Sequence, residues 1–168
     1  MKLTSVQDVY ADHLADLRSV ETQLIDVLSD MAEAASDKKL RQAFTGHLAQ
    51  TSRHLERLEA IIRSSPVDVP TETCEAMQGL IGDARKIIQA EASRDVKDVA
   101  LIAAAQRIEH YEIAVYGTAR ALADQLDQRD ARELLSETLG EENQADELLT
   151  KLATGGLIVA GLNERAQN

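Results

Sequence analysis

Apolar residues recur every three or four positions through four long stretches of the chain, which is the spacing of one face of an α-helix. These stretches predict four amphipathic helices that cover residues 4–35, 38–63, 95–126 and 131–154. The last helix ends at Gly155 and Gly156, a pair of glycines that suits a left-handed cap. Each helix presents one apolar stripe, so we expect the stripes to pack against one another.

Short polar joins separate the first helix from the second and the third from the fourth. Thr4 and Gln7 have the spacing of a capping box at the start of the first helix, and Asp37 is a suitable N-cap for the second. Asp95 and Asp98 are expected to begin the third helix. Because a tight join makes neighbouring helices antiparallel, the four helices form two helical hairpins.

A connection of about 30 residues joins the two hairpins. Pro66 and Pro70 interrupt the helical pattern there, since proline cannot donate a backbone hydrogen bond, and the amphipathic segment 74–90 predicts a short extra helix. Aromatic residues make up only 2% of the chain, which disfavours a β-rich fold. The sequence predicts an all-α, ferritin-like four-helix bundle over residues 1–155, with a C-terminal tail over 156–168 that crosses the end of the bundle.

The charge balance disfavours nucleic acid as a partner. The chain carries 29 acidic and 18 basic residues, and no long basic run interrupts this excess of carboxylates, which opposes binding to a phosphate backbone. No apolar run reaches the length of a membrane span. Cys74 is the only cysteine, so it forms no internal disulfide, and we expect it to be a small buried side chain. These features predict a cytoplasmic protein that binds neither nucleic acid nor membranes.

Carboxylates occupy positions that the helical pattern places inside the bundle. Glu21 lies four residues after Leu17 and four before Ile25, so it points along the middle of its apolar stripe. The same reasoning places further polar side chains inside, namely His47, Thr51, His54, Glu109, Glu112, Glu142 and Asp146. Clustered buried carboxylates are costly unless protons, basic partners or cations compensate them, and inward-facing Lys and Arg are scarce. A cation is the simplest compensation, with protonated or hydrogen-bonded carboxylates as the alternative.

The two halves of the chain also match each other. A shift of 88 residues maps Glu21 onto Glu109, and a shift of 91 maps His54 onto Ala145. Such a match suggests a pseudo-twofold bundle in which Glu21 and Glu109 meet near the axis, flanked by His54 and Glu142. Carboxylates that bridge two ions, with imidazole as a terminal ligand, form a ligand set that suits Fe or Mn. Dimetal sites of this kind take a Glu from each of two helices and Glu-x-x-His from each of the other two.

Several motifs together resemble a known family. They occur in the following order: LRSVETQL (17–24), HLAQTSRHLERLE (47–59), CEAMQGLI (74–81), ALIAAAQRIEHYEIAVYGT (100–118) and ETLGEENQADELLTKLA (137–153). With these motifs the chain resembles the bacterial YciE/YciF-like ferritin-like proteins, related in fold to rubrerythrin and ferritin, over residues 3–153. The resemblance implies a homodimeric ferritin-like bundle associated with bacterial stress responses. It also implies a dimetal centre carried by Glu21, His54, Glu109, Glu112, Glu142 and Asp146.

Neither Glu-x-x-His motif is complete in this chain. Thr51 stands where the Glu of the first motif belongs, and Ala145 stands where the His of the second belongs. Glu112 and Asp146 are available to make up the number of ligands, but the altered set puts redox activity in more doubt than metal binding. Near the site, we expect His47 to be structural or to support a ligand, although its offset of seven residues from His54 leaves ligation open. We expect Glu141 to face solvent and Tyr116 to pack in the core, with a hydrogen bond to the cluster or a redox role as the alternative for Tyr116.

Our leading hypothesis is a metal-binding bundle in which Glu21 and Glu109 bridge two Fe or Mn ions. The remaining ligands would be His54, Glu112, Glu142 and Asp146. If the ions are redox-active, peroxide or dioxygen would be reduced between them. The second hypothesis is a non-enzymatic structural or interaction protein of the stress response, in which the acidic interior is vestigial.

Overall fold

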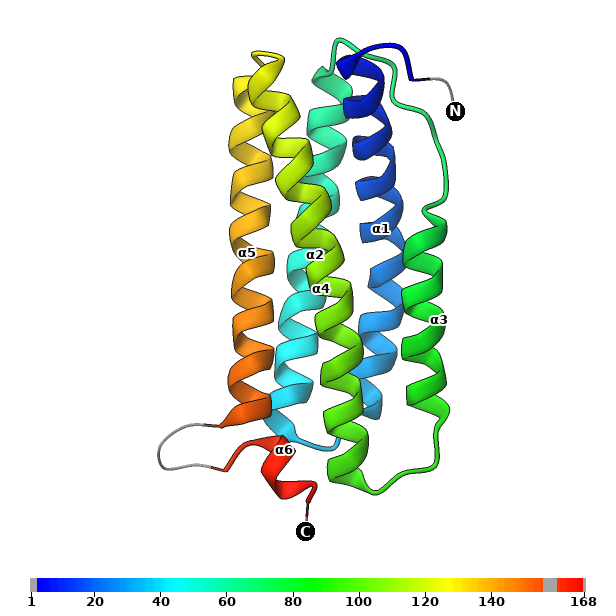
Figure 1. The fold of residues 1–168 in the computed structure, drawn as a ribbon, viewed down its shortest axis with the longest axis vertical. Coiled ribbons are helices and arrows are strands. Elements are labelled where there is room, and N and C mark those ends of the chain that lie inside the picture. The colour runs from blue at the N-terminus through cyan, green and yellow to red at the C-terminus, as the bar shows by residue number, and fades with distance from the viewer. Residues whose placement is uncertain (1–2, 156–159, 168) are drawn as a thin grey trace.

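The computed structural model describes residues 3–155 and 160–167 and shows a bundle of long helices (Figure 1). The helices are α1 (Val6–Ala34), α2 (Lys38–Ser64), α3 (Glu75–Gln89), α4 (Arg94–Gln125), α5 (Arg129–Thr154) and α6 (Leu162–Arg165). Around the bundle the order is α1, α2, α5, α4, and each neighbour runs antiparallel to the next. The predicted all-α four-helix bundle is confirmed, with α3 as the extra helix of the long crossover, packed on the outside of α1 and α4.

The first two helices begin at side-chain caps. The capping box of α1 lies one residue later than predicted, because the Ser5 hydroxyl accepts from the Asp8 backbone N–H and the Asp8 carboxylate accepts from that of Ser5. Thr4 donates to the same carboxylate, so an acidic residue at this position satisfies more donors than Gln7 would. Asp37 caps α2 as predicted, and it accepts from the backbone N–H groups of the second and third residues of that helix.

Asp98 has a different role from the one predicted. The first turn of α4 follows Ser93, and Asp98 lies one turn further on, where it is fully buried. Its two carboxylate oxygens accept hydrogen bonds of 2.8 Å from the backbone N–H groups of Ser36 and Asp37. Asp98 therefore ties the α1–α2 join to the start of the second hairpin. Arg165 donates to the Asp37 carboxylate and fastens α6 to the same end.

Two apolar clusters fill the bundle, one at each end. The upper cluster consists of Tyr10, Leu14, Leu17, Leu58, Ile61, Tyr116, Ala119, Ala123, Ala131 and Leu135. The larger lower cluster includes Leu24, Met31, Phe44, Met77, Ile81, Leu101, Ile108, Leu149 and Leu162. Along every long helix the residues of one cluster precede those of the other, and on α2, α4 and α5 the buried polar residues of mid-helix lie between them, while Glu21 of α1 follows Val20. The apolar core is therefore divided by a polar layer at mid-height.

The end of α5 requires glycine. Gly155 has a φ of 71°, a value that side chains with a Cβ rarely adopt, and it forms an isolated β-bridge with Ala160. Gly156 and the start of the predicted tail lie outside the described residues. From Gly161 onward α6 packs across the lower ends of α4 and α5, where Leu162 is buried (Figure 1). Within the described part of the chain, the longest apolar segments of the helices fall short of what a bilayer crossing requires.

Candidate metal centre

The polar layer between the two clusters is formed by side chains from all four long helices. Its buried members are Glu21, His47, Thr51, His54, Glu109, Glu112, Thr138 and Glu142. Five of the six ligands predicted from the sequence therefore lie in this layer. The helical repeat accounts for their convergence, since residues three, four or seven apart on one helix point to the same side.

The layer contains two groups of metal-ligand atoms. The first group consists of His47, Glu109, Glu112 and Glu142, and the second of Glu21, His54 and Glu142. Within each group, one ligand atom from every residue lies within 4.8 Å of all the others. Glu142 belongs to both groups, whereas the bridging residues predicted from the sequence are Glu21 and Glu109. That role depends on how far each helix is shifted along the bundle, which helical periodicity does not specify.

Each group has one imidazole. His54 Nδ1 lies 2.8 Å from Glu142 Oε1 and 3.4 Å from Glu21 Oε1. His47 Nε2 lies 3.3 Å from Glu109 Oε1 and 3.5 Å from Glu142 Oε2. The two rings come from positions seven residues apart on α2, about 10 Å along the helix axis, and lean together so that their centroids are 6.3 Å apart. His47, predicted to be structural, is therefore the imidazole of the first group.

Most of the buried polar atoms without a hydrogen-bond partner belong to this layer. They are Glu21 Oε2, His47 Nε2, Thr51 Oγ1, His54 Nδ1, Glu109 Oε2 and both carboxylate oxygens of Glu112 and of Glu142. Buried polar atoms in proteins normally have partners, and a cluster of exceptions calls for a bound ion or water. Several of these atoms approach one another closely but lack hydrogen-bond geometry. Carboxylate and imidazole donors in this arrangement fit a pair of cations.

Burial makes the layer electrostatically unstable by itself. Desolvation and repulsion from Glu142 raise the pKa of Glu21 to about 7, although contacts with His54 oppose the rise. The same two causes raise the pKa of Glu109 and of Glu112 well above the ordinary range. Desolvation would lower the pKa of His54, but contacts with the Glu142 and Glu21 carboxylates outweigh it and raise that pKa to about 10. The raised pKa values mean that, without cations, Glu109 and Glu112 hold their protons rather than their charges.

The imidazole of His47 is neutral, which is the form that ligates a metal. Desolvation lowers the pKa of His47, and the attraction of Glu142 offsets only part of that effect. Its Nδ1 lies 3.4 Å from the side-chain oxygen of Gln50, which leaves Nε2 directed at the first group.

A chain of polar contacts on the α2–α5 side orients His54. The Glu141 carboxylate accepts from His54 Nε2 at 2.7 Å and from the Arg57 guanidinium, and Arg57 also pairs with Glu137. Partial burial opposes ionisation of Glu141, but the hydrogen bonds from Arg57 and His54 lower its pKa, so it is an anion. The prediction that Glu141 faces solvent was wrong. The sequence offered one signal for this contact: Arg57 follows His54 by one helical turn, so the two side chains can reach the same carboxylate.

Tyr116 packs in the core as predicted, and its hydroxyl also reaches the layer. The ring is fully buried in the upper cluster, and the hydroxyl donates a hydrogen bond to Glu21 Oε1. Burial and the negative charge of Glu21 raise the pKa of Tyr116 far above its usual value, so the phenol remains protonated. Cys74, on the opposite side of α1, is buried as expected and contacts the Tyr111 hydroxyl at 3.0 Å.

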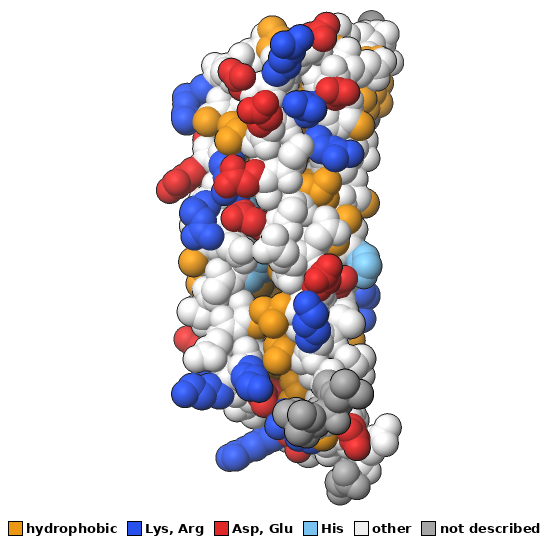
Figure 2. Space-filling model, turned by 90° about the vertical axis from the view of Figure 1, so that its left-hand side faces the viewer, with side chains coloured by type: hydrophobic (Ala, Val, Ile, Leu, Met, Phe, Trp, Pro, Cys, Tyr) orange, Lys and Arg blue, Asp and Glu red, His pale blue; other side chains and the backbone are white. Residues whose placement is uncertain are grey.

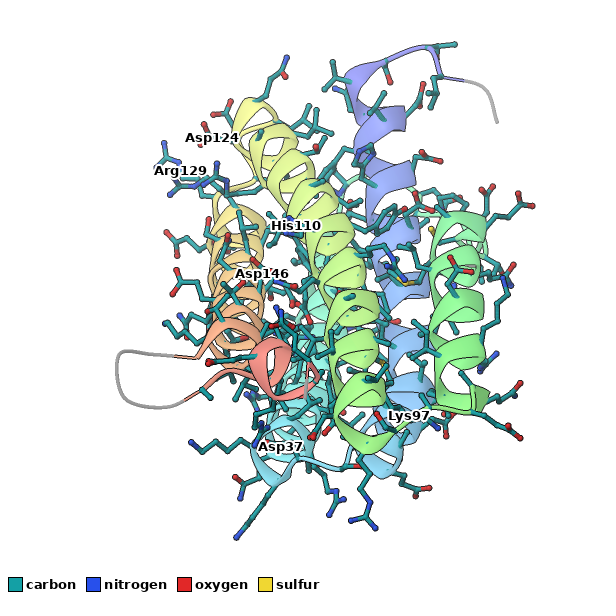
Figure 3. The ribbon with its side chains drawn as sticks, turned by 60° about the horizontal axis from the view of Figure 1, so that its bottom comes forward. Asp37, Lys97, His110, Asp124, Arg129 and Asp146 are labelled. Atoms are coloured by element: carbon teal, nitrogen blue, oxygen red, sulfur yellow. The ribbon has the colours of Figure 1, made fainter. Side chains whose placement is uncertain are left out.

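Asp146 lies apart from both groups. Its carboxylate is half-buried, accepts from the Gln106 amide at 3.2 Å, and lies 3.5 Å from Nε2 of the exposed His110. Figure 3 shows Asp146 and His110 near each other on the α4–α5 face. A side chain four residues after Glu142 shares its side of α5, but these two partners on α4 hold the shorter Asp carboxylate away from the layer.

Comparisons with known proteins agree with this architecture. The family described as a domain of unknown function, DUF892, matches residues 5–165. Protein YciF of Escherichia coli (strain K12) is 43% identical over 169 residues, which span 100% of this chain and 99% of that protein. The crystal structure of the E. coli stress protein YciF matches with a TM-score of 0.87 and 44% identity, covering 89% of this chain and 95% of that one. YcfI from Rhodopseudomonas palustris, described as a proposed structural protein, matches with a TM-score of 0.86 and 34% identity, covering 90% and 97%.

Proposed function

Since the chain belongs to the DUF892 family of YciF-like proteins, we propose that its polar layer is a dimetal centre of a stress-response protein. The observation that carries this proposal is the set of buried carboxylate and imidazole atoms that lack partners and fall into two groups sharing Glu142. Mixed oxygen and imidazole ligands suit Fe or Mn better than Mg or Ca, which prefer oxygen alone. The homodimer and the cytoplasmic location predicted from the sequence remain predictions.

Each ion has its own residues in this proposal. His47, Glu109 and Glu112 would hold the first, Glu21 and His54 the second, and Glu142 both. Asp146 is not included, because it is engaged on the outer face of the bundle.

The surrounding residues prepare the centre for reaction with a small oxidant. When bound, two Fe or Mn ions supply electrons for the reduction of peroxide or dioxygen. The apolar clusters above and below exclude bulk water from the two ends of the layer. Tyr116 holds the Glu21 carboxylate by its hydroxyl, and Glu141 fixes the ring of His54 so that Nδ1 points into the layer.

Metal analysis tests this function directly. Protein purified without chelators, or reloaded anaerobically with Fe(II) or Mn(II), is expected to bind about two equivalents per chain. The oxidation of the Fe(II) form by peroxide can be followed by ultraviolet absorbance. A rate equal to that of the buffer blank would contradict the reaction, whereas binding below about a tenth of an equivalent would contradict the centre itself.

The orienting role of Glu141 can be separated from its ion pair with Arg57. We expect Glu141→Ala to weaken Mn(II) binding about 10- to 100-fold, because His54 loses the partner that fixes its ring. Glu137→Ala is the matched control, since Glu137 also pairs with Arg57 but does not contact His54. Competition titrations against a chelator would measure both variants. Equal losses of Mn(II) affinity in the two variants would mean that the ion pairs of Arg57, rather than the contact between Glu141 and His54, support metal binding.

A structural role is the second candidate, and the description of YcfI favours it. In that case the layer would serve only packing, and metal-free and metal-treated protein would have the same melting temperature. Thermal unfolding with EDTA and with Mn(II) distinguishes the two functions, because a ligand that binds only the folded state must stabilise it.

A further inference from the structure

A pocket of about 260 Å³ opens between α2 and α5 at the level of the first group. His47 and Glu109 line it together with apolar side chains that include Phe44, Ala145 and Leu148. Figure 2 shows this side of the molecule, with apolar side chains gathered on its lower half and a small area of histidine visible beside them. The pocket therefore connects the surface with the polar layer.

Exposure within the layer agrees with this path. His47 and Glu109 retain 5% and 2% of their surface, whereas Glu21, Glu112 and Glu142 retain none. A molecule that arrives through the pocket would meet His47 and Glu109 first. Both offer a buried atom without a hydrogen-bond partner, His47 Nε2 and Glu109 Oε2.

The pocket exists where the internal repeat of the chain is broken. In the match between the two halves, Ala145 corresponds to His54. Ala145 stands where the second Glu-x-x-His motif would have its His, and it lines the pocket. Because its side chain ends at Cβ, the space that an imidazole at this position would fill is open to solvent. The imidazole of the first group comes instead from His47 on α2.

The lining selects the charge and the size of the occupant. Phe44, Ala145 and Leu148 offer apolar contact, and Leu148 remains 45% exposed, more than most large apolar residues of the described chain. Among the residues that line the pocket none is Lys or Arg, so an anion finds no counter-charge and is repelled by the acidic layer. The polar residues nearer the surface are the uncharged amides Gln50 and Gln144. The volume lies just below the range of roughly 300–1,000 Å³ that is typical of ligand pockets.

From these features we infer that the pocket binds a small organic molecule that carries no negative charge and has an apolar body and a hydrogen-bonding polar end. The apolar body lies against Phe44 and Leu148, and the polar end lies beside His47 and Glu109. The inference rests on the proposed function for its biological meaning, since it names the class of organic molecule that approaches the dimetal centre. Binding itself requires no metal.

A matched set of fluorinated probes tests the charge selection. Fluorine NMR of the metal-free full-length chain is expected to give a dissociation constant of about 1 mM for 4-fluorobenzyl alcohol. The anion 4-fluorobenzoate should bind at least about tenfold more weakly than the alcohol, because the acidic layer repels it. No binding of the alcohol, or equal binding of the anion, would overturn the inference.

A variant that fills the pocket tests its location. Ala145→Leu should weaken binding of the alcohol at least about tenfold. Ala121→Leu, at an exposed site on α4, should leave binding unchanged. Melting temperatures would confirm that both variants fold, and unchanged binding in a folded Ala145→Leu chain would exclude this pocket.

Loading the chain with Mn(II) separates this inference from the proposed function. The paramagnetic ion should broaden the fluorine signal of the bound alcohol, because the pocket adjoins the centre. If the chain takes up no Mn(II), the dimetal proposal fails while the metal-free titration still decides the pocket. If Mn(II) binds and the bound probe stays sharp, the probe occupies another site and the inference fails.

Discussion

Glu142→Gln is expected to abolish stable binding of both metal ions, because Glu142 is the carboxylate that the two ligand groups share. Replacing a carboxylate with an amide removes the negative charge and one acceptor oxygen while preserving the shape of the side chain. We expect the affinity for Mn(II) to fall by more than about 100-fold, and the stoichiometry to fall from two toward zero rather than to one.

The comparison with other variants makes this result specific. Glu21→Gln removes a ligand of the second group alone, so one ion should remain bound. Glu147→Gln, on the exposed side of α5, is the control that changes the net charge equally without touching the layer. Isothermal titration with Mn(II) and elemental analysis after desalting would measure all three. Retention of one full equivalent by a folded Glu142→Gln protein would show that the groups do not share this carboxylate.

The stability of the metal-free protein should fall as the pH rises, opposite to the behaviour of the metal-loaded form. The pKa of Glu21 is about 7 in the folded chain, against an ordinary value of 4.5, so the folded state binds more protons than the unfolded state between these values. Because stability decreases with pH wherever the folded state binds more protons, Glu21 alone contributes a loss of about 3 kcal/mol across that interval. The pKa of His54 is raised from 6.5 to about 10, so its stabilising contribution is complete below 6.5 and is lost toward pH 10.

Bound metal reverses the sign of this dependence. An ion must displace protons from its carboxylate and imidazole ligands, so its binding strengthens as the pH rises. Urea unfolding with EDTA and with Mn(II), between about pH 5 and pH 8, should therefore give diverging free energies of unfolding. Glu112→Gln should make the free energy of unfolding of the metal-free protein depend less on pH, because it removes a carboxyl group whose pKa is raised by burial. Parallel curves with and without metal would contradict the proposed centre.

Helical periodicity was sufficient to predict that five of the six candidate ligands face the interior. Glu21 and Glu109 were placed inside by their distances from apolar neighbours three, four or seven residues away, and both are buried. The pairing of helices followed from the two short joins and the single long connection. These inferences depend on geometry within one helix or on the length of a loop, which the order of residues specifies.

Contacts between helices were harder to predict. The shared role of Glu142, and the contribution of His47 to the first group, depend on how α2 and α5 are shifted along the bundle. Asp146 has the inward spacing but finds partners on the outer side of α4, and Glu141 is drawn inward by Arg57. In each case a partner on another helix determines where the carboxylate or imidazole group of the side chain lies.

The division of the apolar core into two clusters has a consequence for how rigid the molecule is. Without ions, the apolar contacts between helices are concentrated toward the two ends of the bundle, and the layer between them holds buried polar atoms without hydrogen-bond partners. Two bound ions would cross-link all four long helices at the polar layer. In the proposed dimetal form, the stiffness of the molecule would therefore depend on whether the centre holds metal.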